Sequence, residues 1–309
     1  MERRLKSERH HWWPECVSAH WADDKGGVNW LLPNGDTRRS TPANFGVIGN
    51  GHHILLGRPG EQTVWDESFE QEFDRADSNF PGVIQWLESV HHEPTPLPVE
   101  RRRRFLPRSA SDQELSNLSE CLVSLAVRSP MTREIAVGLA EHLRGPLPDR
   151  ERNVLIGSNL RSTHKRTVKE VSGRGKYVVI FSPDREFVFG DGFFHNITPP
   201  GGHALAPEML VPVTPRLSVL FVVPLSYTVL PRVFSLTVSS EEADALNQVV
   251  QVYARTAIFY RNDRPEIQPI YAVGKHLKFE TPDNLPDQII ANIPGVDTGD
   301  LALRRLFGR

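Results

Sequence analysis

Apolar residues recur at helical spacing in three long stretches of the chain. The first covers residues 65–90, where Pro81 predicts a break or a kink. The second covers residues 111–145 and is interrupted at Pro130, which predicts a kinked helix or a pair of helices. The third follows Ser239. A Ser-x-x-Glu capping box opens each of the last two helices, formed by Ser111 with Glu114 and by Ser239 with Glu242.

Extended segments alternate with turn residues in the rest of the chain. Near the N-terminus, Val28–Leu32 and Gly51–Leu56 read as short strands, and Asn34-Gly35 between them is a strong hairpin signal. Later segments are apolar on both faces, which predicts strands buried on both sides of a sheet. These segments are Tyr177–Phe181, Glu186–Phe189, Met209–Val213 and Leu217–Val223.

The order of these elements favours an α+β fold over a doubly wound parallel sheet. We expect a single large domain, with a mostly antiparallel sheet and helices packed on one side. The domain would cover residues 1–261, with an Arg-rich linker near 93–110. Residues 262–309 would form a Pro-rich C-terminal extension that ends in a short helix from Asp300.

Composition limits the binding partners and the compartment that we expect for the protein. The 36 basic and 38 acidic residues give a formal net charge of −2, so binding to nucleic acid or membrane would need a local patch. The run Arg101–Arg104 is a solvated loop or such a phosphate-contacting patch. The two cysteines form no CxxC pair, and the longest apolar run, Leu217–Leu225, is too short for a membrane span. We therefore expect a cytoplasmic protein with no membrane partner.

Histidine pairs are the most distinctive polar feature of the N-terminal third. Neighbouring side chains in extended backbone point to opposite faces, so a metal site would need one histidine from each of several pairs, plus a carboxylate. His11, Asn44 and His53 also supply, in order, the residue types of a ββα nuclease, an order that arises readily by chance. The pairs are His10-His11, His52-His53 and His91-His92, and the candidate carboxylates are Asp23, Asp66 and Asp74.

Polar residues in the second half of the chain stand at positions that suggest a site. Asp191 ends an apolar strand beside two glycines, where it either projects into a cleft or caps a turn. Asn247 lies in an apolar helical stripe and either braces that strand or contacts a ligand. Arg128 and Arg133 flank Pro130, where each satisfies a freed carbonyl or presents a fork to an anion.

The chain lacks the GxGxxG, P-loop, GxSxG and HExxH motifs, which argues against dehydrogenases, nucleotide kinases, serine hydrolases and zincins.

Seven short segments, taken in chain order, resemble the bacterial family catalogued as domain of unknown function 4238. The resemblance runs from about His10 to Tyr260 and implies that His11, Arg128, Arg133, Asp191 and Asn247 converge on one cleft. The Ser and Pro around the family's Asp are absent, and the family's aromatic pair is His52-His53 here. The segments are His10-His11-Trp12-Trp13-Pro14, Ser40-Thr41-Pro42-Ala43-Asn44, the acidic helix region with Asp66 and Asp74, Arg128-Ser129-Pro130-Met131-Thr132-Arg133, Gly190-Asp191-Gly192-Phe193, Pro212-Val213-Thr214-Pro215 and Leu246-Asn247.

Together these observations lead to a hypothesis of a bacterial hydrolase or nuclease that acts on a phosphate-bearing substrate such as nucleic acid, in defence or as a toxin. His11, Asp191 and Arg133 would be catalytic, and Arg128 and Asn247 would bind substrate. A divalent metal would be held by His10, His11 and Asp191. The alternative is a non-catalytic sensor or adaptor that binds a protein partner through the Pro-rich extension.

Overall fold

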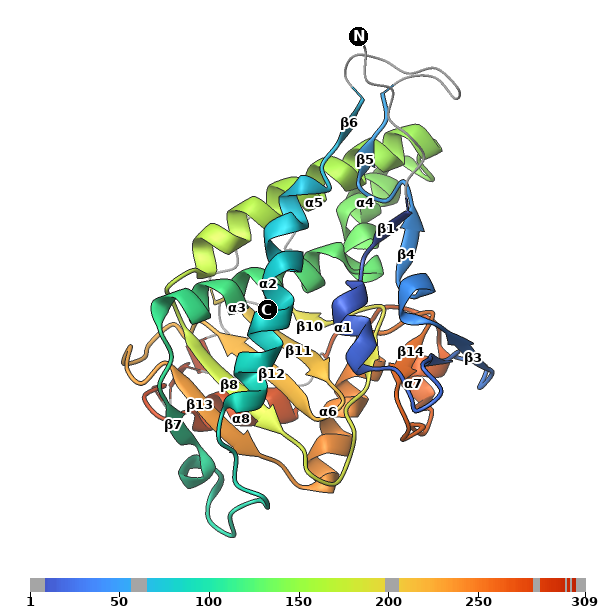
Figure 1. Cartoon of the computed structure of the whole chain (residues 1–309). Helices are drawn as coiled ribbons and strands as arrows, with labels where there is room; N and C mark the ends of the chain where they lie inside the picture. Colours follow the sequence, from blue (N-terminus) through green and yellow to red (C-terminus); the bar gives the residue numbers. More distant parts are fainter. Residues whose placement is uncertain are drawn as a thin grey trace.

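A six-stranded sheet forms the centre of the fold, which we describe from a computed structural model (Figure 1). The structure describes residues 9–56, 66–197, 206–279, 284–297, 299–300 and 302–303. All neighbouring strands of this sheet are antiparallel except β13 and β8, which are parallel. The strand order is β10 (Phe194–His195), β11 (Glu208–Thr214), β12 (Leu217–Val222), β8 (Lys176–Phe181), β13 (Val233–Thr237) and β7 (Leu106–Arg108). The predicted α+β fold with a mostly antiparallel sheet is confirmed.

Four helices gather on one side of this sheet (Figure 1). They are α2 (Gln71–Ser89), α3 (Asp112–Arg128), α4 (Pro130–Arg144) and α5 (Asp149–Val171). In the sheet, Tyr177 faces this group, because its hydroxyl lies 2.6 Å from that of Ser119 on α3. Lys176, the preceding residue, points to the opposite face. There its ammonium lies close to Gly295, in the segment after helix α8 (Leu285–Asn292).

Both faces of the sheet are therefore covered, which differs from the expected one-sided packing. The reason is the two-sided apolar character of the strands, since every residue of β11, β12 and β13 is buried.

A second, four-stranded antiparallel sheet lies beside the first. Its order is β3 (Thr37–Ser40), β2 (Val28–Leu31), β14 (Ile258–Tyr260) and β9 (Phe189–Gly190). The predicted hairpin at Asn34-Gly35 is present, with Gly35 at φ +90°, but it joins β2 to β3 rather than to residues 51–56. The strand expected at Glu186–Phe189 is reduced to β9, which pairs with β14 and not with the neighbouring β8.

Two small ladders stand at one end of the molecule, near the N-terminus of α2 (Figure 1). Strand β1 (Arg9–His11) pairs with β4 (Val47–Gly49), and β5 (His53–Ile54) pairs with β6 (Glu67–Ser68). The short helices α1 (Glu15–His20) and η1 (Pro42–Asn44) connect this region to the rest. Helix α5 packs tightly on β5, because a Cβ placed on Gly157 would lie 2.7 Å from the side chain of Ile54.

The segments expected to be a linker and an extension belong to the main body. The arginine run forms η2 (Arg101–Arg104), where Arg104 donates to Glu242 of helix α6 (Ser240–Tyr253), and β7 completes the sheet edge. After residue 261, α7 (Pro269–Ala272) and α8 follow, and one hydrophobic core extends from Trp12 to Val296. Of the expected tail helix, Asp300 and residues 302–303 are helical, and residues 301 and 304–309 lie outside the described residues.

Local helix signals were read correctly from the sequence. Both capping boxes are present, at Ser111 and Ser239. Ser129 ends α3 and caps α4, so Pro130 separates a pair of helices. Helix α2 instead continues through Pro81, and Trp65, assigned to the same stretch, lies outside the described residues.

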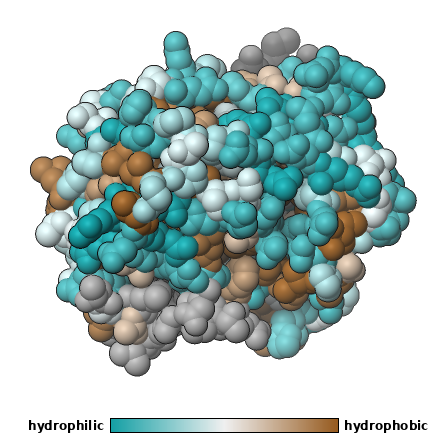
Figure 2. Space-filling view, turned by 90° about the horizontal axis from the view of Figure 1, so that it is seen from below, coloured by the Kyte–Doolittle hydropathy of each residue, from teal (hydrophilic) through white to brown (hydrophobic). Residues whose placement is uncertain are grey.

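Polar residues dominate the face shown in Figure 2, where apolar residues form several separate patches.

Candidate functional site

Three potential metal ligands converge where the two small ladders meet helix α2. They are His10 from β1, His52 from the turn after β4, and Glu70, the residue before α2. One ligand atom from each lies within 4.8 Å of the other two, and this is the single such group of three or more in the described part of the chain. The N–H of Phe69 donates to the carbonyl of His52 at 2.9 Å, which ties the start of α2 to the turn.

Glu70 is the shared partner of both imidazoles. Its Oε2 contacts Nδ1 of His52 and lies 3.9 Å from Nε2 of His10. The backbone N–H of His52 donates to Nδ1 of His10 at 3.1 Å, so the proton of a neutral His10 lies on Nε2 and points toward Glu70. The rings of His10 and His52 are stacked, with centroids 4.9 Å apart.

Burial keeps the imidazole of His52 neutral. The side chains of His10 and His52 are 3% and 1% exposed, whereas that of Glu70 is 35% exposed. Burial, followed by the positive charge of Arg128, lowers the pKa of His52 to about 2. A neutral imidazole donates from one nitrogen and offers the lone pair of the other, and Glu70 opens the group to solvent.

His11, expected to be catalytic and a metal ligand, lies on the other side of β1. Alternation along the strand turns His10 into the protein, and Nε2 of His11 lies 3.3 Å from the carbonyl of Ala43. His11 is therefore not part of the group of three. Asn44 of the ββα pattern bonds to Arg9 and Thr41.

Arg128, expected to bind substrate, is fully buried and forms an ion pair. Its Nη1 and Nη2 donate to the two oxygens of Asp77 at 3.0 and 2.5 Å, and its guanidinium lies 4.7 Å from the ring centroid of Phe73. Nη1 also lies 3.3 Å from the carbonyl of His11, to which it donates. This fork is already matched to a carboxylate.

Arg133 lies beside the histidine–glutamate group and is only partly buried. Its Nη1 donates to the carbonyl oxygen of Gly51 at 3.0 Å, next to His52. Burial, and then the charge of Arg152, lower the pKa of Arg133 to about 10, so it remains a cation at neutral pH. No carboxylate lies within ion-pair distance of it among the described residues.

Asp191 does not join the metal group in this structure. Its carboxylate accepts the backbone N–H of Arg255 at 2.7 Å and the N–H and hydroxyl of Thr256 at 2.9 and 2.5 Å. Its own carbonyl accepts the N–H of Met131, at the start of α4. The side chain is 2% exposed. Asp191 thus holds the turn after α6 against α4.

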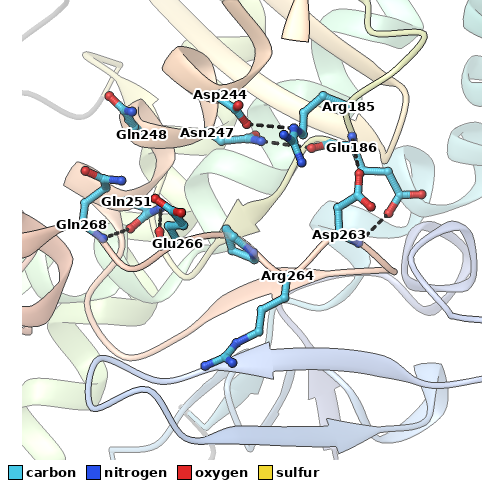
Figure 3. Close-up of a pocket in the computed structure, with 11 residues that line it drawn as sticks. Arg185, Glu186, Asp244, Asn247, Gln248, Gln251, Asp263, Arg264, Glu266 and Gln268 are labelled. Atoms are coloured by element: carbon cyan, nitrogen blue, oxygen red, sulfur yellow. Dashed lines mark hydrogen bonds and ion pairs between the residues drawn. The ribbon is translucent and has the colours of Figure 1, made fainter. Parts of the chain in front are cut away.

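Asn247 lines a polar cavity of about 330 Å³ between α6, residues 185–186 and residues 263–268 (Figure 3). Its amide accepts the N–H of Val188 at 3.0 Å and donates to the carbonyl of Glu186 at 2.9 Å. Both groups of the buried amide therefore bind backbone, which fixes β9 away from β8. Asn247 therefore braces the strand, which is one of the two roles expected from the sequence.

Of the three residues in this group, His10 is the one that the sequence predicts as a metal ligand. Sequence reasoning also required histidines from separate pairs, which His10 and His52 satisfy. It missed Glu70, because the acidic residues around the start of α2 carry no pattern that singles one out. Of the carboxylates it named, Asp66 accepts the N–H of Leu56 at 2.6 Å and Asp23 pairs with Arg39.

The chain matches no protein-family model, no curated protein and no solved structure. The resemblance to the family of unknown function therefore stays a prediction. In the described ranges, no helix has the length and apolar character needed to cross a bilayer. The chemistry of the site is therefore inferred from the geometry of His10, His52 and Glu70 alone.

Proposed function

We propose that the chain is a metal-dependent hydrolase whose metal centre is formed by His10, His52 and Glu70. The observation that supports it is the convergence of two buried imidazoles and one partly exposed carboxylate, from three separate elements, within 4.8 Å. Two histidines and one carboxylate are the ligand set of a catalytic zinc site, which keeps a further position open for water or substrate. The divalent metal expected from the sequence thus has His10 in common with this centre, and not His11 or Asp191.

A divalent ion at this position would act as a Lewis acid toward an ester oxygen and would lower the pKa of a water molecule. The protein supplies the orientation. The rings of His10 and His52 are held by stacking on each other, and Glu70 is held directly before α2. Glu70, at 35% exposed, is the member of the group that solvent reaches.

Metal binding at this centre requires a defined proton rearrangement. An ion coordinated by Nε2 of His10 displaces the proton there, and a neutral imidazole then carries its proton on Nδ1. Nδ1 now accepts the backbone N–H of His52, so that bond must open. The amide of His52 is therefore a specific reporter of metal at this position.

Metal binding is tested by calorimetric titration of chelator-treated protein with Zn²⁺, Co²⁺ and Mn²⁺. We expect one ion per chain, and a loss of affinity of about tenfold or more in Glu70→Gln. Glu72→Gln is the matched control, because Glu72 lies on the same helix and pairs with Lys165 at 2.7 Å instead. The same affinity in wild type and Glu70→Gln, or an unchanged amide signal of His52 on metal addition, would refute the centre.

Hydrolysis is tested separately, with a chromogenic phosphodiester and with single- and double-stranded nucleic acid. We expect turnover that is lost on chelation and in Glu70→Gln, and that survives in Glu72→Gln. Turnover that persists after chelation would show that the metal has no part in the reaction. A protein that binds metal in the expected way but hydrolyses none of these substrates would favour the non-catalytic alternative.

A further inference from the structure

Arg133 occupies an electrostatically unfavourable position next to the proposed centre. It belongs to the first turn of α4, where the helix dipole places positive partial charge. The positive charge of Arg152 acts on it, and its own charge in turn acts on His52. Its assigned hydrogen bond goes to a neutral carbonyl, that of Gly51. The helix dipole and the charge of Arg152 both disfavour a cation, and the one neutral carbonyl does not neutralise it, so a bound anion would stabilise Arg133.

Arg128 shows how the same fold neutralises an arginine when the role is structural. Asp77 receives both of its terminal nitrogens, and Phe73 covers the guanidinium. Arg144, further along α4, is likewise paired with Glu151. Arg152 binds Glu141 at 3.1 Å. Arg133 differs from these neighbours in having no carboxylate within ion-pair distance in the described part of the chain.

The backbone of the helix does not offer an anion site of its own. The N–H of Met131 donates to the carbonyl of Asp191, the N–H of Thr132 to the hydroxyl of Ser129, and that of Arg133 to the carbonyl of Ser129. An anion in this region is therefore bound by the guanidinium of Arg133. One of its terminal nitrogens is fixed by Gly51, which leaves the other edge of the fork for a ligand.

We propose that Arg133 is the substrate-binding residue of the centre and that the substrate carries a phosphate group. This inference rests on the proposed metal centre. Its bond to the carbonyl of Gly51, the chain neighbour of His52, and the effect of its charge on His52 place the guanidinium near the centre, where one tetrahedral anion would contact both. Two of its oxygens then accept from the open edge of the Arg133 guanidinium and a third faces the metal. A planar carboxylate that fills the fork of Arg133 has no third oxygen to offer the metal.

The experiment measures binding of inorganic phosphate to metal-loaded protein, with acetate as the comparison anion. We expect Arg133→Gln to weaken phosphate binding by about tenfold or more, as the loss of a charge-assisted bond implies. Arg133→Lys should retain part of the affinity, because it keeps the charge but loses the fork. Arg144→Gln, an exposed change on the same helix, should bind phosphate as the wild type does.

Thermal unfolding separates this role from a structural one. Removing a cation that has no counter-ion should leave the melting temperature of Arg133→Gln equal to or above that of wild type. A clear fall in melting temperature, with phosphate affinity unchanged, would overturn the proposal. So would equal binding of phosphate and acetate.

Failure of the metal centre gives a different pattern. If Glu70→Gln leaves metal binding unchanged while Arg133→Gln still loses phosphate, the metal assignment is wrong and the anion site stands. If metal binds as proposed and Arg133→Gln binds phosphate normally, the centre stands and Arg133 is not its anion ligand.

Discussion

The ion pair between Arg128 and Asp77 gives the sharpest test of whether Arg128 is structural. Arg128 is fully buried and Asp77 is 34% exposed. In Asp77→Asn the shape is kept, but a buried guanidinium loses its counter-ion while the carbonyl of His11 and the ring of Phe73 remain. The free energy of unfolding at neutral pH should therefore fall.

The size of the effect follows from the burial of the two partners. Removing one partner of a fully buried pair costs roughly 3–5 kcal/mol. Asp77 is partly screened by solvent, which reduces the expected loss to about 2–3 kcal/mol. Arg128→Met removes the buried charge itself and leaves Asp77 able to turn to water. That variant should lose less, roughly 1–2 kcal/mol.

Urea unfolding followed by circular dichroism measures both variants and the double variant. Because the buried cation is absent in Arg128→Met, adding Asp77→Asn should cost almost nothing further, which gives a coupling energy of about 2–3 kcal/mol. Losses that simply add, or a loss below about 0.5 kcal/mol in Asp77→Asn, would refute the structural assignment. Such a result would return Arg128 to the ligand-binding role.

Three further predictions concern buried polar groups outside the proposed centre. Asp191→Ala should lower the free energy of unfolding, measured in urea, by about 2–4 kcal/mol, because the N–H groups of Arg255 and Thr256 lose their acceptor. Calorimetry should show unchanged metal affinity in this variant. Unchanged stability with weakened metal binding would instead place Asp191 in the metal site. Burial lowers the pKa of His164 to about 4 and of His195 to about 3. Between pH 6.5 and 4.5 the unfolded chain therefore binds more protons than the folded protein, and the free energy of unfolding falls with falling pH by about 1.4 kcal/mol per pH unit for each histidine. Urea unfolding should show a shallower dependence on pH in His195→Gln, and an unchanged dependence would contradict this cause. Burial lowers the pKa of Lys176 to about 8, and its ammonium donates a hydrogen bond only to the carbonyl of Pro231 in the described structure. Lys176→Met should therefore raise the free energy of unfolding at pH 7 by roughly 1–3 kcal/mol. A lower urea midpoint in this variant would show that the ammonium of Lys176 stabilises the fold.

The sequence by itself determined the features that depend on near neighbours. A capping box needs only the residues at Ser111 and Glu114, and a hairpin turn needs only Asn34 and Gly35. Pro130 ends one helix and starts the next for reasons contained in its own ring. The alternation of apolar and turn residues was likewise enough to indicate an α+β fold.

Helix α5 was missed because its buried face is not uniformly apolar. Gly157, His164 and Thr167 take positions on that face, which dilutes the periodic signal that a sequence reading depends on. The strand expected at Glu186–Phe189 is reduced to β9 because a residue distant in the sequence binds its backbone. Asn247, distant in sequence, takes the N–H of Val188 and the carbonyl of Glu186 and directs β9 into the other sheet.

The candidate site was decided by tertiary structure alone. His10 and His52 are 42 positions apart, and His52 and Glu70 are 18 apart, so no local spacing relates them. The pairing of β1 with β4 and the bond from Phe69 to His52 bring the three together. The choice of His10 over His11 depends on which face of β1 turns inward. Long-range packing places Asp77 beside Arg128 and not beside Arg133, so only the charge of Arg128 is neutralised by it. Residue types can therefore be listed from the sequence, whereas their partners are set by long-range packing.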